Sequence, residues 1–211
     1  MATSALGETR SERKRKLILT SARAIFTREG FAQAGMEQVA RDAGVSTATL
    51  YAYFPGKAEL FRIVVEETIG DITARVVESS AVTGDAAARL TSFGKAYAEF
   101  YCSPTARATF RMVISERRRF PQLADHFQMR SRLELGGTLL ALLKALEENG
   151  EIVVERPSWA AGQFQGMIEH ATLILGLVGG DDVMPVRPLD TIVAEAVETF
   201  LARYGVRERA A

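Results

Sequence analysis

The sequence predicts an all-α protein of two domains, a small N-terminal domain of three helices and a larger helical C-terminal domain. Apolar residues recur at helical spacing along nearly the whole chain, and glycine and proline residues separate the periodic stretches. Residues 151–156 include an apolar run that is compatible with extended backbone, but no second strand is evident to pair with it, so we predict a loop. We expect the N-terminal domain to cover residues 1–57 and the C-terminal domain residues 58–211.

The first helix of the N-terminal domain follows residues 1–10, which are small and polar and which we expect to form a disordered arm. An apolar stripe marks this helix, and Gly30 ends it. A basic cluster at its start has two interpretations, a solvated helix end or a contact with the DNA backbone. Cations oppose the helix dipole at an N-terminus, which slightly favours the second. The cluster comprises Arg10, Arg13, Lys14, Arg15 and Lys16.

Two short helices joined by a tight turn come next. Gly35 begins the first of them, and Gly44 supplies the left-handed or crowded backbone that ends it. Ser46 offers a hydroxyl N-cap for the second helix, residues 47–54, which turns Leu50 inward. Helix, glycine turn and helix at this spacing form a helix-turn-helix motif, whose second helix enters the major groove of DNA. The alternative is an ordinary helical hairpin with exposed tyrosines.

The outer face of the second short helix carries hydroxyl groups between small residues. Small side chains permit a close approach to DNA, and hydroxyls can reach phosphates or base edges. Lys57, just beyond this helix, would lie close to the DNA backbone; the alternative is a solvated lysine. The candidate DNA contacts are Thr47, Ala48, Thr49, Tyr51, Tyr53, Lys57 and, at the start of the preceding helix, Met36.

The run from about Lys16 to Phe61 resembles the N-terminal domain of TetR-type transcriptional regulators. Three pieces agree in order and spacing, namely ILTSARAIFTREGF, MEQVARDAGVS and TLYAYFPGKAELF. The resemblance implies a three-helix DNA-binding domain on a larger helical regulatory domain, working as a homodimer, with Lys57 on a phosphate. The family commonly has Thr near the start of its second helix, where this chain has 34–36 as Ala-Gly-Met. The side-chain contact is therefore lost there, although a backbone amide can still bind phosphate.

The C-terminal domain reads as helices throughout. A long helix begins near Ala58 and ends near Ser79, and Asp85 is the expected N-cap of the next. Proline and glycine punctuate the remainder, and Pro157 suits a first helical turn. The further predicted helices span residues 86–101, 105–118, 123–149, 157–178 and 189–204.

The last two long helices are apolar over a broad side. A helix of this kind is either deep core or an interface. A helix-turn-helix protein that reads half-sites about 34 Å apart requires a dimer, so we expect these helices to form a four-helix bundle with their copies; the alternative is that both only close the monomer core. The predicted interface residues are Phe164, Met167, Ala171, Ile174, Ile192, Val193, Val197 and Phe200.

Aromatic residues are concentrated in the helices between the long helix and this interface. Aromatics and methionines line adaptable apolar sites, and they also make plain core. As a group they favour a pocket for a lipophilic or aromatic effector of unknown identity. The run RMVISERRRFPQLADHF also resembles the C-terminal domain of AefR-like regulators, which names no ligand. The candidate pocket residues are Phe93, Tyr97, Phe100, Phe110, Val113 and Phe127.

The amino-acid composition further limits the functions that the protein can have. Lysine plus arginine equals aspartate plus glutamate, 26 each, yet residues 1–57 hold nine basic against five acidic side chains, as expected if only this part meets phosphate. The single cysteine, Cys102, rules out an internal disulfide and fits a reducing cytoplasm. We find no run of eighteen apolar residues and no signal-peptide pattern, so we expect no membrane association. The two histidines lack metal-ligand spacing, and we expect no metal, no cofactor and no enzymatic activity.

These observations predict a sequence-specific DNA-binding transcriptional regulator in the cytoplasm, a ligand-responsive repressor that binds a pseudo-palindromic operator as a homodimer. Two alternatives come from other classes. An all-helical enzyme would need an acid, base or nucleophile cluster, for which two histidines and one cysteine are poor material. An architectural DNA binder would lack sequence preference, and the acidic remainder of the chain and its aromatic cluster argue against it.

Overall fold

The computed structural model describes residues 9–180 and 183–206, together with all their side chains except those of residues 71–73 and 80. The expected disordered arm therefore lies almost wholly outside the described residues. The chain divides into two compact units, Met1–Glu67 and Thr68–Ala211, which we call the head and the body. The division falls within the long helix α4 (Lys57–Ser80) rather than at its start, where the sequence placed the boundary.

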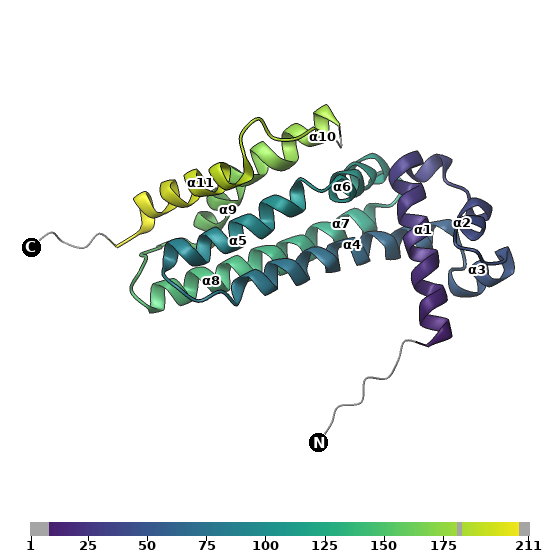
Figure 1. Ribbon diagram of the computed structural model, residues 1–211, viewed down its shortest axis with the longest axis horizontal. Helices are drawn as coiled ribbons and strands as arrows, with labels where there is room; N and C mark the ends of the chain where they lie inside the picture. The colour runs from purple at the N-terminus through teal and green to yellow at the C-terminus, as the bar shows by residue number, and fades with distance from the viewer. Residues whose placement is uncertain (1–8, 181–182, 207–211) are drawn as a thin grey trace, which may run out of the picture. The chain divides into compact units, whose positions relative to one another are not determined.

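The head contains α1 (Arg10–Gln33), α2 (Met36–Asp42), α3 (Thr47–Tyr53) and the first part of α4 (Figure 1). Gly30 has φ 75° and ψ 171°, so regular helix stops there before a last short turn, as predicted. Phe26, Phe31 and Phe61 pack together with ring centres 4.9 to 6.1 Å apart, and each is at most 4 % exposed. This cluster fixes α4 on α1 and supports the motif formed by α2 and α3.

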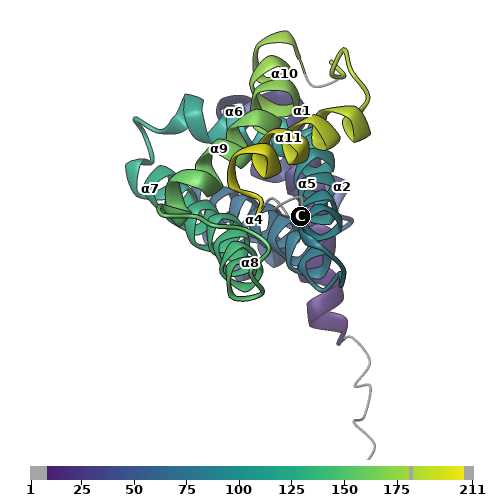
Figure 2. The same cartoon turned by 90° about the vertical axis from the view of Figure 1, so that its left-hand side faces the viewer.

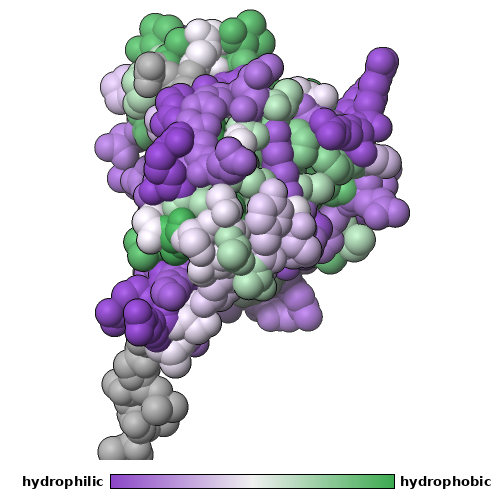
Figure 3. All heavy atoms as spheres, turned by 90° about the vertical axis from the view of Figure 1, so that its right-hand side faces the viewer, coloured by the Kyte–Doolittle hydropathy of each residue, from purple (hydrophilic) through white to green (hydrophobic). Residues whose placement is uncertain are grey.

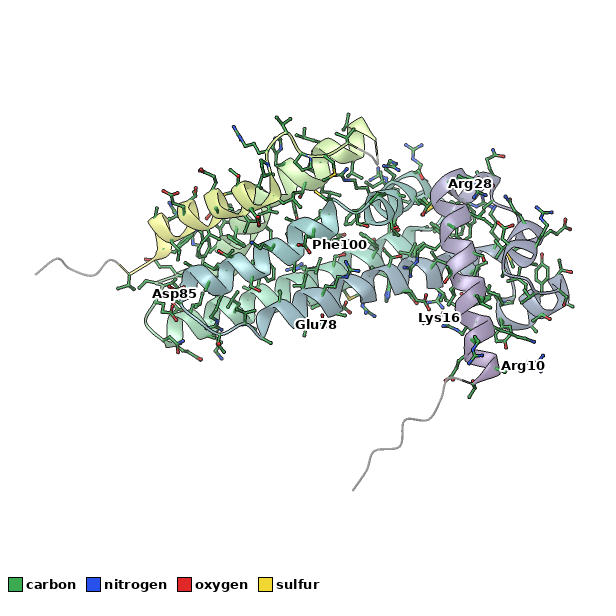
Figure 4. All side chains as sticks on the ribbon, viewed as in Figure 1. Arg10, Lys16, Arg28, Glu78, Asp85 and Phe100 are labelled. Carbon is green, nitrogen blue, oxygen red and sulfur yellow. The ribbon has the colours of Figure 1, made fainter. Side chains whose placement is uncertain are left out.

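The body contains the rest of α4 and all later helices (Figures 1 and 2). Asp85 caps the first of them by accepting from the amide of Ala88 at 2.8 Å, as predicted, and Figure 4 shows Asp85 at the start of this helix and Phe100 near its end. The later helices are α5 (Ala86–Tyr101), α6 (Pro104–Glu116), α7 (Pro121–Ser131), α8 (Gly137–Glu148), α9 (Pro157–Glu169), α10 (Leu175–Gly179) and α11 (Leu189–Tyr204).

Two of the predicted helices contain π-helical turns. Residues Arg132–Gly136 (η1) join α7 to α8, and residues His170–Ile174 (η2) join α9 to α10. The predicted spans 123–149 and 157–178 are therefore each one continuous rod with an altered turn in the middle. A π-helical turn inserts one residue and is frequently found at functional sites. Apolar periodicity does not reveal it, because the apolar stripe continues on both sides.

The segment predicted as a loop, 151–156, has a partner after all. Ile152 forms an antiparallel bridge with Gly205. The amide of Val153 donates to the carbonyl of Tyr204 at 2.8 Å, and the amide of Val206 donates to the carbonyl of Glu151 at 3.0 Å. The sequence analysis missed this pairing because the partner is the short stretch after the last helix, which carries no strand signal of its own.

The core of the body lies where α11 runs along α5 and α9, which are adjacent in both views (Figures 1 and 2). A Cβ on Gly94 would come within 2.8 Å of Val193 Cγ1, so this glycine sets the close approach of α5 to α11. Phe164 packs between Phe93 and Phe200, with ring centres 6.2 and 5.5 Å away. The aromatic rings therefore hold three helices together.

Most of the predicted interface residues belong to this core. Ile192, Val193, Val197, Phe164 and Phe200 are all buried within the single chain. Apolar periodicity reports burial and does not distinguish burial by the same chain from burial by a copy. Of the predicted set, Met167, Ala171 and Ile174 keep exposed surface.

Candidate DNA-binding surface and ligand cavity

The turn between α2 and α3 has the geometry that the sequence predicts. Gly44 has φ 66°, a left-handed conformation that a side chain would strain. The amide of Val45 returns to the carbonyl of Ala40 at 3.0 Å, and Ser46 Oγ accepts from the amide of Thr49 at 3.1 Å. One turn thus ends α2, reverses the chain and caps α3.

Helix α3 buries one side and exposes the other. Leu50 and Phe54 are at most 1 % exposed, whereas Thr47 and Ala48 are exposed and Tyr51 keeps 50 % of its surface. In the view of Figure 3, hydrophilic side chains and residues of intermediate hydropathy make up most of the visible surface. A helix that is apolar beneath and small or hydroxylic above is suited to a DNA groove.

The predicted contacts on α3 fall into two groups. The hydroxyl of Thr49 is 2.8 Å from that of Ser46, and the hydroxyl of Tyr53 is 2.9 Å from that of Ser11 on α1. Thr49 therefore contacts the N-cap of its own helix, and Tyr53 fastens α3 to α1. Thr47 and Tyr51, in contrast, form no hydrogen bond to any residue that the structure describes, and they leave their hydroxyls for an outside partner.

Lys57 is held in place rather than freely solvated. Its Nζ donates to the carbonyl of Ala32 at 3.0 Å and lies 4.7 Å from the centre of the Phe31 ring. The ammonium therefore sits at the junction of α1 and α4, at the first residue of α4. Met36 is the first residue of α2 and is half-buried, and Gly35 before it makes no side-chain cap, in keeping with the departure noted in the sequence.

The basic cluster lies on the first two turns of α1, where Figure 4 labels Arg10 and Lys16. A capping box precedes it: Thr9 Oγ1 accepts from the amide of Glu12, and the Glu12 carboxylate accepts from the amide of Thr9 at 2.7 Å. The hydrogen bonds from the backbone and then the side chain of Thr9 lower the pKa of Glu12. This carboxylate offsets the unfavourable placement of cations at a helix N-terminus. Arg15 pairs with Glu67 at 3.1 Å.

The body holds a cavity of about 440 Å³. Its walls come from α5, the η1 turn with its flanking residues, and α9. Of the six predicted pocket residues, Tyr97 lines it. The other five do not: Phe110 and Phe127, for example, contact each other edge to face with ring centres 4.8 Å apart and belong to the packing of α6 and α7.

The polar end of the cavity contains residues that the sequence analysis missed. The hydroxyl of Tyr97 donates to Oε1 of Glu169, and Tyr101 packs edge to face on Tyr97 with ring centres 4.7 Å apart. Burial first, and then the neighbouring Tyr101 and Glu169, raise the pKa of Tyr97 well above its usual value. Burial also raises the pKa of Tyr101. Both phenols are therefore neutral hydrogen-bonding groups at physiological pH.

A buried arginine supports the same region. Arg107 on α6 is fully buried, and its Nε donates to the carbonyl of Tyr101 at 2.9 Å. Its remaining nitrogens donate to the carbonyls of Thr172, at 2.7 Å, and Val183. A Cβ on Gly176 would overlap the guanidinium, so α10 passes directly over it. One side chain thus ties together α5, η2 and the segment before α11.

The described residues contain no group of three or more His, Cys, Asp or Glu side chains placed to hold a metal ion. No helix in the described part of the chain is both long enough and apolar enough to span a bilayer.

A compact three-helix unit with a capped, outward-facing α3 places the protein among the helix-turn-helix DNA-binding proteins. Comparison with known families narrows the class. Residues 18–64 match the DNA-binding domain of the bacterial regulatory proteins of the tetR family, and residues 88–206, more than half of the chain, match the C-terminal domain of AefR-like transcriptional repressors. The chain belongs to the TetR family of DNA-binding transcriptional regulators, with an AefR-like C-terminal domain.

Individual relatives agree with this assignment. The HTH-type transcriptional activator FasR of Mycolicibacterium smegmatis is 32 % identical over 91 residues, which cover 43 % of this chain and 41 % of FasR. The chain therefore aligns with about two fifths of the length of that curated relative. A TetR-family regulator from Mesorhizobium loti has the same fold over 94 % of this chain and 100 % of its own, with a TM-score of 0.82 and 26 % identity. The flavonoid-responsive regulator FrrA covers 93 % of this chain and 99 % of its own, with a TM-score of 0.70 and 25 % identity.

Proposed function

We propose that this regulator is a ligand-responsive repressor. It binds a pseudo-palindromic operator as a homodimer and releases the DNA when a small apolar or aromatic effector enters the body. The observation that carries the proposal is the pairing of an exposed groove-reading helix in one unit with a cavity of ligand size in the other. Ligand sites commonly occupy about 300–1,000 Å³, a range that includes this cavity.

The head supplies the DNA contacts in this proposal. Thr47, Ala48 and Tyr51 face base edges in the major groove, since they lie on the exposed side of α3. Thr49 and Tyr53 hold the helix in register and reach the backbone. The ammonium of Lys57 and the α2 start at Met36 contact phosphate, which fixes position without reading sequence.

The dimer surface lies on α9 and η2 beside the buried core. Met167, Ala171 and Ile174 keep exposed apolar surface there, and Gly162 and Gly166 leave room for a close approach because nothing lies within 4 Å of a Cβ on either. A shallow hollow of about 420 Å³ between α9 and α11 adjoins them and includes Met167 and Phe200 in its lining. Two half-sites about one turn of DNA apart require two heads in one assembly.

Repression is supported by the AefR-like repressor domain, which covers more than half of the chain. FasR, which is similar to part of this chain, is an activator. A second candidate function is therefore activation by the same DNA-binding surface. An in vitro transcription assay separates the two, because a repressor lowers the transcript from its own promoter region and an activator raises it.

A mobility-shift titration tests the proposal as a whole. The DNA is the region upstream of the protein's own gene, at physiological salt, against increasing nonspecific competitor. We expect a retarded species that resists competitor, with the mass of two chains per operator in light scattering. Binding that any competitor removes equally would mean an architectural role, and monomeric behaviour at micromolar concentration would overturn the dimer.

A further inference from the structure

We propose that the cavity between α5, η1 and α9 binds a cationic amphipathic molecule. Such a molecule is an amine with an apolar or aromatic portion, and its ammonium pairs with Glu169. This inference deepens the proposed function by naming the chemical class of the effector. It depends on that function only for the consequence of binding, because binding itself can be measured without DNA.

The apolar portion of such a ligand fits the cavity walls. Leu133, Leu135, Leu140 and Ala161 provide apolar surface. Gly136, Gly137 and Gly162 also line the cavity, and a Cβ on any of them would meet no atom within 4 Å. The missing side chains therefore contribute to the open volume of about 440 Å³, which is enough for a ring and a short alkyl chain.

Glu169 selects the charged group of the ligand. Its Oε1 accepts from the hydroxyl of Tyr97, and Glu169 has no other hydrogen-bond or ion-pair partner among the residues that the structure describes. This half-buried carboxylate has one neutral donor and no cationic partner, and an opposite charge stabilises a carboxylate that is partly removed from water. An ammonium at the remaining oxygen supplies both the charge and the donors.

The neighbouring groups favour a cation over an anion. Tyr97 and Tyr101 stay neutral because burial raises their pKa values, so neither phenol adds a charge beside Glu169. Arg132 is the other charged side chain that lines the described cavity, but it is exposed and belongs to the mouth. An anion paired there would remain in water, where an ion pair contributes little, and Glu169 would repel it further in.

The position of Glu169 is fixed by the contacts of the η2 turn that follows it. It is the last residue before η2, and within η2 the carbonyl of Thr172 accepts from the buried guanidinium of Arg107 at 2.7 Å. The η1 turn forms the opposite wall. The η1 turn lines this cavity, and η2 begins directly after Glu169, which agrees with the frequent occurrence of such turns at functional sites.

Isothermal titration of the purified full-length protein with three probes of one shape tests the inference. The probes are 4-phenylbutylamine, 4-phenylbutan-1-ol and 4-phenylbutyric acid. We expect the amine to bind about tenfold more tightly than the alcohol, since a hydrogen bond between charged partners is worth at least that factor, and the acid to bind most weakly. Equal binding of all three, tighter binding of the acid, or no binding of the amine would overturn the proposal.

Three variants assign the preference to the carboxylate. Glu169→Gln removes the charge and keeps the shape, so the amine should lose its advantage while the alcohol binds as before. Tyr97→Phe keeps the carboxylate, and the preference for the amine should survive it. Lys144→Gln changes an exposed cation on α8 outside the cavity lining, and it should leave all three affinities within about threefold of the wild type. An amine preference that persists in Glu169→Gln would contradict the assignment, provided that circular dichroism shows an unchanged fold.

A mobility shift in the presence of the amine separates this inference from the proposed function. Release of the operator by the amine and not by the acid supports both. Amine binding with no change in operator affinity leaves the ligand class standing and refutes ligand-responsive repression. Release by an added compound that neither competes with the amine nor depends on Glu169 would place the effector site elsewhere and count against the cavity.

Discussion

In the head, Thr47, Ala48 and Tyr51 stand exposed on α3, whereas in the body Arg107, Tyr97 and Tyr101 are each at most 3 % exposed. The polar groups of the head are therefore placed by local helix geometry and face outward. Those of the body are placed by contacts between helices far apart in sequence and face inward. A surface side chain can be changed without disturbing the fold, but a buried one cannot.

This difference shows where stability and specificity reside. A change on the outer face of α3 should alter DNA binding and leave unfolding almost untouched. A change to the buried polar groups of the body should alter unfolding first, and ligand binding through it. The predictions below separate these two behaviours, beginning with the largest effect.

The largest loss is expected for Arg107→Met. The substitution leaves the carbonyls of Tyr101, Thr172 and Val183 without the donors that now satisfy them in a buried site. Since each unsatisfied buried group costs about 1–3 kcal/mol, we expect the free energy of unfolding to fall by about 3 kcal/mol or more. Urea unfolding followed by circular dichroism measures it.

Arg118→Met is the matched control, because Arg118 is exposed in the turn after α6 and should change the free energy of unfolding by less than about 0.5 kcal/mol. Similar losses for both variants would mean that the buried arginine is not the tie between α5, η2 and the segment before α11.

Alanine substitution at two helical glycines of the body should change the stability of the protein in opposite directions. In Gly176→Ala the new Cβ overlaps the Arg107 guanidinium, which we expect to cost about 1–3 kcal/mol. In Gly137→Ala the Cβ meets no atom within 4 Å, and replacing glycine in a helix should add about 0.5–1 kcal/mol of stability. Thermal melts of the two variants give the signs directly.

Gly137→Ala also sharpens the comparison, because Gly137 lines the cavity. This variant should be more stable than the wild type and yet bind 4-phenylbutylamine more weakly, as its methyl group occupies cavity volume. Stability and binding that rise together would show that the cavity does not hold the ligand.

The N-caps of α3 in the head and α6 in the body are both serines, so the stabilising effect of one hydroxyl can be compared between the two units. Ser46 accepts from the amide of Thr49 at 3.1 Å, whereas Ser103 at the same position of α6 makes no side-chain cap hydrogen bond to the described residues. We expect Ser46→Ala to lower the stability of α3 by about 1 kcal/mol and Ser103→Ala to have almost no effect. Amide hydrogen exchange resolves each helix separately, and equal effects would mean that the caps do not differ in solution.

The sequence predicted best the features that depend on neighbouring residues. Gly44, Ser46 and Leu50 lie within two turns of each other, and their roles follow from backbone conformation, capping and helical spacing. Asp85 as the cap of α5 is a prediction of the same kind and was confirmed. Each needs only the positions three or four residues away.

The features that the sequence analysis missed depend on contacts across the fold. Tyr97 and Glu169 are on different helices, and no local pattern pairs them, although Tyr101 at i+4 from Tyr97 was within reach of helical spacing. Glu169 is the single charged side chain of α9, and it was a signal for a polar site that we did not use. Val193 and Phe200 were assigned to a partner because burial by the same chain leaves the same apolar pattern.

The smallest and most specific effect is expected where the head meets DNA. Lys57→Ala removes one cation from the phosphate contacts. The affinities for operator and for nonspecific DNA should therefore fall almost equally, and the slope of log affinity against log salt concentration should fall by roughly one counterion. Thr47→Ala removes a hydroxyl from the exposed face of α3, so it should change the ranking of operator variants and leave the slope as it is. Lys57 also lies against Phe31, and a melt must show that the head is intact before its slope is interpreted. An unchanged slope in Lys57→Ala, or a uniform loss in Thr47→Ala, would reverse the roles of the two residues and with them the orientation of α3 in the groove.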